Sequence, residues 1–196
     1  MEVTVRQQIQ FIMGGGIVER FHGCPGIKPN TDAAHQHGVA MLCYLLWNTK
    51  VISVRGQFLS GPPRVELLMA ALTHDLAEQV ASDISAPSKQ ILGIAKQLHD
   101  FEESVLARYQ LSFYELLTTE EKRVLGWADA FDGMLYCVLE IGRGNKLMLR
   151  PYRKWCTWMD EIQTQFTPAA TEIYAAIKSL FEEYSEGSTY DCFDEH

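Results

Sequence analysis

The chain has 196 residues, which is enough for one hydrophobic core and short for two. It carries 25 acidic residues against 17 lysines and arginines, a formal net charge of -8, whereas a general nucleic-acid binder presents a basic face. The best candidate for an apolar span, Gly38 to Trp47, is too short to cross a bilayer. We therefore expect one domain over residues 1–196 that binds neither nucleic acid nor membrane.

The cysteines and the N-terminal residues favour a cytoplasmic protein. The five cysteines are scattered and form no C-x-x-C pair, which is typical of free thiols in a reducing compartment. The opening residues, MEVTVRQQIQ, include an early acid and lack the apolar core of a secretory signal.

Apolar residues recur at helical spacing along most of the chain. This periodicity predicts helices at residues 2–13, 33–48, 64–80, 88–108, 119–142, 151–165 and 168–185. Glycines and prolines indicate a loop over 14–32, and Val51 to Val54 is the only short β-branched run. Residues 186–196 are polar and acidic and are expected to fray. The pattern predicts an all-α fold.

Two predicted helix starts have a capping mechanism. Thr118 followed by Glu121 fits a capping box, in which each side chain satisfies a free backbone N–H of the other residue. Thr167 followed by Pro168 fits an N-cap with proline at the first helical position.

A histidine–aspartate pair, His74-Asp75, ends the uncharged run from Leu67 to Thr73 and should be largely buried. A buried carboxylate is costly unless it is paired or bound to a metal. The pair is therefore either part of a metal site or a satisfied polar group of the core. A second pair, His99-Asp100, lies in an amphipathic pattern that indicates a solvated helix face.

A second histidine lies on the inward stripe of its predicted helix. His35 is followed at helical spacing by Val39, Leu42, Cys43 and Leu46, whereas His37 meets a less apolar face. His35 is either a core histidine bonded to a carbonyl or a metal ligand opposite His74.

Two acids compete in the predicted helix 119–142. Asp129 lies between small and aromatic residues, where a carboxylate needs compensation, and Asp132 follows three residues later. Spacing alone does not choose between them. Histidines and aspartates together make a nitrogen and oxygen ligand set that suits Mn²⁺, Co²⁺, Fe²⁺ or Zn²⁺.

Glu78 lies four residues after His74, one turn later on the same face of the predicted helix. It is either a proton acceptor for an attacking water or a surface acid near a helix end. Asp83 and Lys89 then follow in a turn at the mouth of the same site.

Taken in order, these residues resemble the H…HD…D pattern of the HD-domain metal-dependent phosphohydrolases. The closer similarity is to their small single-domain branch, the bacterial 5'-deoxynucleotidases and related phage deoxynucleoside triphosphohydrolases. The resemblance covers roughly residues 18 to 145, in the stretches Arg20-Phe21-His22, Lys28-Pro29-Asn30-Thr31-x-x-Ala34-His35, His74-Asp75-Leu76-Ala77-Glu78, Asp83-Ile84-x-x-Pro87-x-Lys89 and Trp127-Ala128-Asp129-Ala130.

The resemblance implies a role for each matching residue. The ligands of a divalent metal (Mn, Co, Zn, Fe or Mg) would be His35, His74, Asp75 and Asp129. Glu78 would handle the attacking water, and Asp83 would sit near the leaving oxygen or the sugar. Arg20 and Lys89 would bind phosphate oxygens, and Phe21 would pack on the sugar.

The chain departs from the pattern at two positions. Tryptophan is usual where this chain has Phe21, and relatives often have a lysine three residues before Asp129, where this chain has Gly126.

The resemblance implies a single HD-domain helical bundle that hydrolyses deoxyribonucleotides. The compact segment between Asp75 and Asp129 is similar to the phage enzymes, which favours a dNTP triphosphohydrolase, with dATP as one candidate. The alternatives are a 5'-deoxynucleotidase acting on dNMPs and a non-catalytic nucleotide-binding domain. We also expect a homo-oligomer, at least a dimer, in the cytoplasm, or in the host cytoplasm if the protein is of phage origin.

Overall fold

The computed structural model describes residues 3–21, 24, 26–48, 62–82, 84 and 86–185. Within these ranges the chain forms helices and no strand, apart from an isolated bridge between Glu19 and Thr31, so the predicted all-α class is confirmed. The α-helices are α1 (Val5–Gly15), α2 (Asp32–Asn48), α3 (Val65–Thr73), α4 (Glu78–Ala81), α5 (Ala86–Leu92), α6 (Ala95–Arg108), α7 (Thr119–Gly142), α8 (Leu149–Ile162) and α9 (Pro168–Ser185). Short 3₁₀ helices are η1 (Tyr114–Leu116), η2 (Lys146–Met148) and η3 (Gln163–Gln165).

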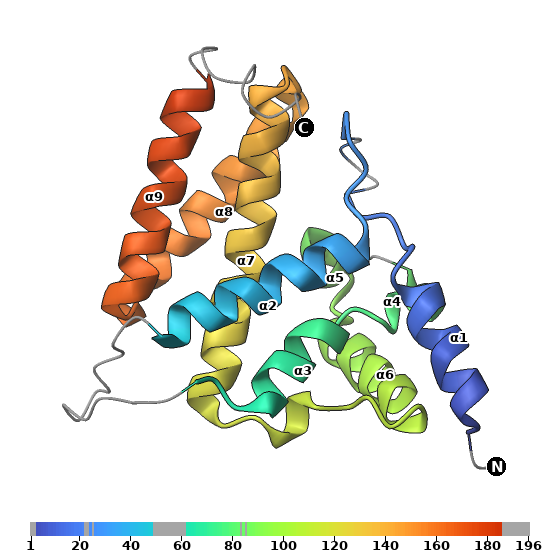
Figure 1. Ribbon diagram of the computed structural model, residues 1–196. Coiled ribbons are helices and arrows are strands. Elements are labelled where there is room, and N and C mark those ends of the chain that lie inside the picture. The colour runs from blue at the N-terminus through green and yellow to red at the C-terminus, as the bar shows by residue number, and fades with distance from the viewer. Residues whose placement is uncertain are drawn as a thin grey trace, which may run out of the picture.

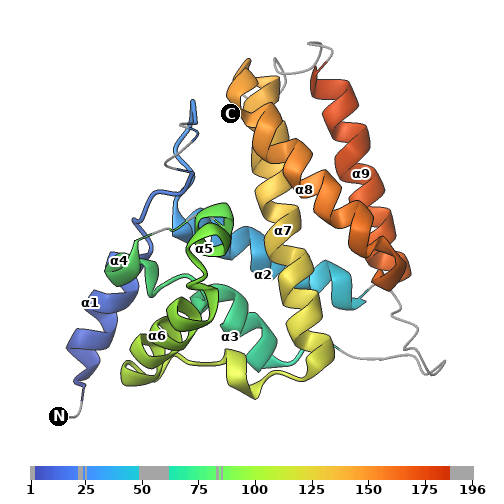
Figure 2. The same cartoon turned by 180° about the vertical axis from the view of Figure 1, so that it is seen from behind.

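Helix α7 is the centre of the molecule. It packs against α2, α3, α8 and α9. In Figure 1, α2 crosses in front of α7, and Figure 2 shows α8 on the opposite side of α7. The side chains of Phe131 and Met134 on α7 are fully buried in the main apolar core. Because α2 and α7 cross inside this core, the His35 side chain at their crossing is shielded from water.

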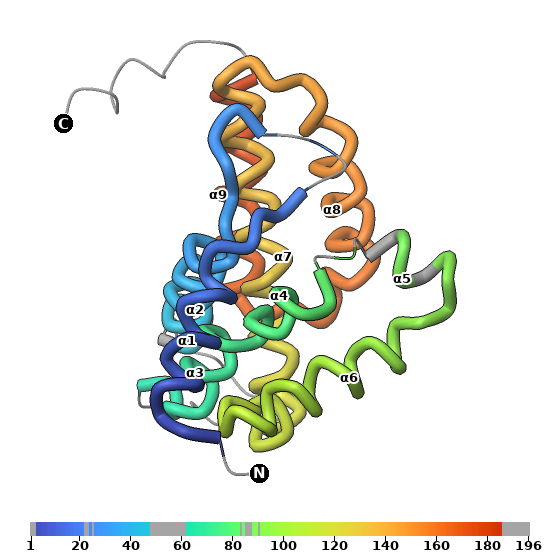
Figure 3. Tube along the Cα trace, turned by 90° about the vertical axis from the view of Figure 1, so that its right-hand side faces the viewer, coloured from blue at the N-terminus to red at the C-terminus, as the bar shows by residue number. Residues whose placement is uncertain are grey.

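A second, smaller apolar cluster supports the segment that follows α3. Phe11 of α1, Leu76 and Ala77, and Leu106 of α6 are all buried together. The Gln79 side-chain amide donates a hydrogen bond to the Phe11 carbonyl at 2.8 Å. Figure 3 shows α5 and α6 projecting to one side of α7, below α8. The cluster holds the residues after α3 against α1 and α6.

Two predicted helices are each broken in the structure. The predicted helix 64–80 ends at Thr73, and a turn precedes α4, because Leu76 and Ala77 are drawn into the smaller cluster. Within this turn the Glu78 N–H bonds to the Asp75 carbonyl at 2.9 Å, a three-residue closure rather than an α-helical one. The predicted helix 88–108 is interrupted at Gly93, whose φ of +64° lies in the left-handed region.

The predicted caps are confirmed. Thr118 and Glu121 form a capping box at the start of α7, whose bounds match the prediction, and Thr167 accepts the Ala170 N–H at 3.2 Å. No helix among the described residues is long and apolar enough to cross a bilayer. The short β-branched run at 51–54 and the predicted frayed tail at 186–196 lie outside the described residues.

Candidate metal centre

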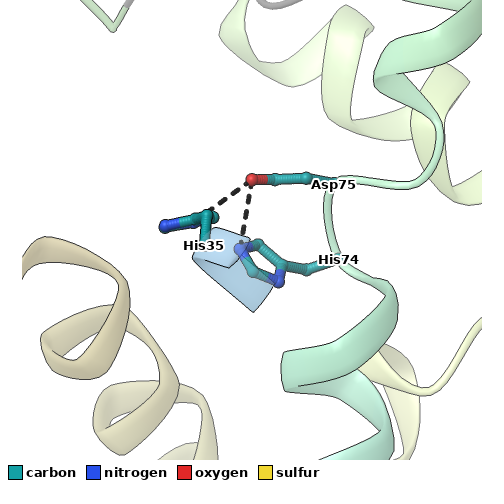
Figure 4. Close-up of side chains that lie close together, drawn as sticks. All are labelled: His35, His74 and Asp75. Atoms are coloured by element: carbon teal, nitrogen blue, oxygen red, sulfur yellow. Dashed lines mark ion pairs between the residues drawn. The ribbon is translucent and has the colours of Figure 1, made fainter. Parts of the chain in front are cut away.

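Three side chains from α2 and the end of α3 converge on one point. His35 projects from the first turn of α2, and His74 and Asp75 follow α3 directly. Asp75 Oδ2 lies 3.4 Å from His35 Nε2 and 3.3 Å from His74 Nε2, so the three side chains point toward one another (Figure 4). Each offers one ligand atom, and these atoms lie within 4.8 Å of one another. The cluster could therefore hold a metal ion.

The hydrogen bonds of the two rings fit a metal better than a satisfied polar core. Nδ1 of His74 donates to the Ala71 carbonyl at 2.9 Å, and Nδ1 of His35 lies 2.7 Å from Asp132 Oδ2. Both Nε2 atoms are buried and form no hydrogen bond with the described residues, although the Asp75 carboxylate lies close to each of them. A metal-ligating histidine typically donates its other ring nitrogen to a carbonyl or carboxylate, which turns the free nitrogen toward the metal. Both rings have this arrangement.

Asp129 and Asp132, between which the sequence spacing did not choose, lie on opposite sides of the His35 ring. Asp129 Oδ1 lies 3.1 Å from His35 Nε2, on the side of the cluster. Asp132 reaches Nδ1, behind the ring. The Asp129 side chain is 41% exposed, the most open of the site acids, so it borders the space that a ligand would enter.

The electrostatics of the cluster favour a cation. Burial lowers the pKa of His35, but the neighbouring carboxylates of Asp129, Asp132 and Asp75 together raise this pKa well above its ordinary value. Burial raises the pKa of Asp75, yet the charges of His74 and Arg20 hold it well below its usual range. The Asp75 and Asp129 carboxylates, whose pKa values are both lowered, are thus ionised, as metal ligands must be, and they favour a positive charge at Nε2.

Arg20 lies on the acidic side of the cluster. Its guanidinium forms an ion pair with Asp75 and lies 3.6 Å from Asp32 Oδ1 and 3.8 Å from Glu78 Oε2. Ligand oxygens of Asp32, Asp75 and Glu78 also lie within 4.8 Å of one another. The structure therefore brings Arg20 and Glu78 to the cluster, as predicted, and adds Asp32.

Glu78 reaches the cluster by a different route from the one predicted. The prediction that it continues the helix of His74 is wrong, because α3 ends at Thr73 and Glu78 begins α4. The intervening turn carries Glu78 inward, and its side chain is only 5% exposed.

Phe21 has an unusual backbone conformation beside the site. Its φ is +63°, in the left-handed region that a bulky side chain rarely adopts. Its ring packs on Tyr136 of α7, with centroids 4.9 Å apart. The Arg20 N–H meanwhile bonds to the Asn30 carbonyl at 2.8 Å, which fixes the chain just before Phe21.

The remaining predicted residues are not gathered into the cluster. Lys89 of α5 lies 3.9 Å from Glu102 of α6, and Asp83 lies outside the described residues. His37 is exposed, as expected for the less apolar face. His99 is half-buried rather than solvated, because its ring stands edge-on against Tyr114.

The sequence did not indicate Asp32 as a site residue, and it left the role of Asp132 open. Asp32 is fully buried, but an acid at the first position of a helix is common and does not by itself indicate a site. Asp132 was considered only as an alternative to Asp129. Because the two acids lie three residues apart and so share one helix face, their spacing indicates that both could reach the same site.

Comparisons with known proteins identify the fold. No family model matches the chain, and no curated protein matches it. One similar solved structure is the HD phosphohydrolase DatZ of cyanophage S-2L, bound to dA and one catalytic Zn²⁺, with a TM-score of 0.67, 14% identity, and coverage of 93% of this chain and 99% of that chain. Another is the PH0347 protein of Pyrococcus horikoshii OT3, with a TM-score of 0.65, 20% identity, and coverage of 91% and 99%. The chain therefore has the fold of the HD-domain proteins.

Proposed function

We propose that the protein is a metal-dependent phosphohydrolase acting on deoxyribonucleotides. The main supporting observation is that the Nε2 atoms of His35 and His74 are buried, face the Asp75 carboxylate and form no hydrogen bond with the described residues. With Asp129 they form a nitrogen and oxygen set that suits Mn²⁺, Co²⁺, Fe²⁺ or Zn²⁺. When bound, such a cation lowers the pKa of water and polarises a phosphoryl oxygen.

The chain's own residues supply the remaining chemistry. Glu78 is a buried carboxylate next to the cluster and accepts the proton of the attacking water. Arg20 presents a guanidinium whose two-pronged geometry matches a phosphate, and it stabilises the charge that develops there. Lys89 of α5, whose ammonium group lies 3.9 Å from Glu102, is the second positive charge that we assign to the phosphate.

Phe21 follows Arg20 directly and packs on Tyr136, and its ring offers an apolar surface on which a deoxyribose can pack. The likeness to DatZ, a phage HD phosphohydrolase bound to dA, supports a deoxynucleotide substrate. We favour a dNTP triphosphohydrolase, which releases deoxynucleoside and tripolyphosphate, with dATP as a candidate. A 5'-deoxynucleotidase, which releases phosphate from dNMPs, uses the same residues and is the second candidate.

Product analysis separates the two activities. Purified protein is incubated with each dNMP and dNTP and with Mn²⁺, Co²⁺ or Zn²⁺, and the nucleoside and the phosphate products are then resolved by ion-exchange chromatography. Deoxynucleoside plus tripolyphosphate identifies the triphosphohydrolase, and phosphate released from dNMPs identifies the nucleotidase.

His74→Ala serves as the metal-site control and should form neither product. If the wild-type protein binds metal and nucleotide but turns over none of these substrates, the enzymatic proposal fails and a nucleotide-binding role replaces it.

A further inference from the structure

A cavity of about 600 Å³, broadly open to solvent, is lined by Cys24 and by residues of η2 and α8. Among the described residues that line it, none is acidic, and the cationic side chains are those of Lys146, Arg150, Arg153 and Lys154. None of the lining residues belongs to the candidate metal centre.

This concentration of positive charge contrasts with the rest of the chain. The net charge is -8, yet no aspartate or glutamate occurs between Ile141 and Met159. Among the described residues, the ion pairs that lysines and arginines form with carboxylates involve other cations than these four. The cavity thus gathers cations that the fold leaves without acidic partners in the described part of the chain.

The arrangement along α8 costs stability. Tyr152 and Met159 bury one face of the helix, while Arg150, Arg153 and Lys154 are exposed. Arg150 is three and four residues from the other two, so like charges are neighbours on the helix surface and repel one another. An anion between them would relieve this repulsion, and a cavity walled by one sign of charge concentrates such anions.

We propose that this cavity binds a small phosphorylated anion of nucleotide size, separately from the metal centre. Its volume falls in the range of small-molecule sites. Arginine forks and lysine ammonium groups are the usual partners of phosphate oxygens. Leu147 and Leu149 add apolar surface that a base or sugar can cover. The net charge of -8 disfavours an extended polynucleotide, so we favour a small ligand.

The cavity is connected to the candidate active site through one loop. Cys24 lines the cavity, and its N–H bonds to the Phe21 carbonyl at 2.8 Å. Phe21 in turn packs on Tyr136 and follows Arg20 directly. A ligand that contacts Cys24 would therefore lie next to the segment that holds Arg20. The binding itself does not depend on the proposed function.

The test measures anion binding without turnover. Inorganic tripolyphosphate is titrated by calorimetry into EDTA-treated wild-type protein and into Arg150→Glu/Arg153→Glu. The charge control is Arg6→Glu/Arg123→Glu, which changes two other exposed arginines by the same total charge. We expect the α8 variant to bind about tenfold more weakly or worse, since each lost charge-assisted hydrogen bond is worth at least that factor. The control should bind like the wild type, with circular dichroism verifying helix content.

Four results would overturn the proposal. The first is no binding by the wild type, and the second is equal binding by the α8 variant. The third is binding that is abolished by Arg20→Ala alone, which would place the anion in the metal centre. The fourth is displacement of tripolyphosphate by a single-stranded oligodeoxynucleotide that binds far more tightly through the same arginines, which would identify a nucleic-acid groove. If dNTP and dNMP turnover are both absent but tripolyphosphate still binds through α8, only the proposed function fails.

Discussion

The two ring nitrogens of His35 face different carboxylates, and each contact has a different consequence. Asp129 lies by Nε2 in the cluster, while Asp132 accepts the Nδ1 hydrogen at 2.7 Å. Asp132 therefore fixes which nitrogen presents its lone pair to the cluster, without offering a ligand atom itself.

Asp132→Asn should keep the shape of this contact and weaken it. Loss of such a supporting carboxylate typically lowers metal affinity by about 10- to 100-fold. Calorimetric titration of the apo protein with Mn²⁺ or Zn²⁺ measures the change. Asp100→Asn, an exposed acid on α6, is the matched control and should leave the affinity unaltered. Wild-type affinity in Asp132→Asn would remove Asp132 from the site.

Glu78→Gln separates the chemistry from metal binding. The variant keeps the side chain's shape but cannot accept a proton, so turnover should fall by about 10²–10⁴-fold with the metal retained. Stability should stay the same or rise, because one of three clustered carboxylates loses its charge. Turnover assays combined with metal analysis check both expectations.

Glu172→Gln, at an exposed position of α9, controls for loss of an acid. Full activity in Glu78→Gln would make another group the base. If the variant lost its metal instead, Glu78 would be a ligand.

A site residue could be predicted where the apolar residues around it in the sequence indicate that its polar side chain is buried. His35 and His74-Asp75 interrupt apolar stretches, and the structure brings them together. The separate roles of Asp129 and Asp132 could not be predicted. They depend on how α7 is rotated against α2, which neither segment encodes alone.

At the scale of elements, the contact of Asp132 on α7 with α2 depends on Gly38. A Cβ at this position would overlap the Asp132 carboxylate, so the absence of a side chain lets Asp132 reach His35. Gly38→Ala should destabilise the protein by about 1–3 kcal/mol through overpacking. It should also lower metal affinity.

Gly126→Ala is the control within α7. A Cβ there meets nothing within 4 Å, so alanine should stabilise the helix by about 0.5–1 kcal/mol. Urea unfolding of both variants measures the difference. Equal stabilities would show that Gly38 is not needed for the close approach.

Glu140 ties the loop before α2 to the end of α7. Its buried carboxylate accepts hydrogen bonds from the Ile27 and Lys28 N–H groups and from Asn145 and Arg143. Burial raises the pKa of Glu140, but these hydrogen bonds outweigh burial and lower it.

A carboxyl group whose pKa is lower in the folded state stabilises the fold when the pH is above its pKa in the unfolded chain, which is about 4.3 for glutamate. This contribution is lost as the pH falls through the folded-state pKa. Glu140→Gln should therefore cost about 1–3 kcal/mol at pH 7 and progressively less below pH of about 4. Urea unfolding across that range checks the trend, and a pH-independent difference would contradict it.

Helices were predictable where a cap and a long periodic pattern agree, as for α7 with Thr118 and Glu121. They were mispredicted where tertiary contacts override the pattern. The segment after Thr73 has helical periodicity, but burial of Leu76 and Ala77 against Phe11 turns the chain. Gly93 carried a local signal for the second break, because glycine adopts positive φ without strain.

For the whole molecule, the candidate ligands join distant parts of the chain. His35 belongs to α2, His74 and Asp75 follow α3, and Asp129 belongs to α7. An unfolded chain holds these groups far apart, so a metal binds the native state far more tightly. Metal binding should therefore stabilise the entire fold by mass action.

This linkage predicts a thermal shift. At a free metal concentration 100 times the Kd, the stabilisation is about 2.7 kcal/mol, which corresponds to a rise in Tm of about 5–10 °C for a chain of this size. Differential scanning calorimetry with excess Mn²⁺ or Zn²⁺, and again with EDTA, measures it. His74→Ala should lose the shift, because one of the converging ligand atoms is gone. His99→Ala, whose ring packs on Tyr114 outside the cluster, should retain the shift. An equal shift in His74→Ala would mean that the stabilising metal binds elsewhere on the protein.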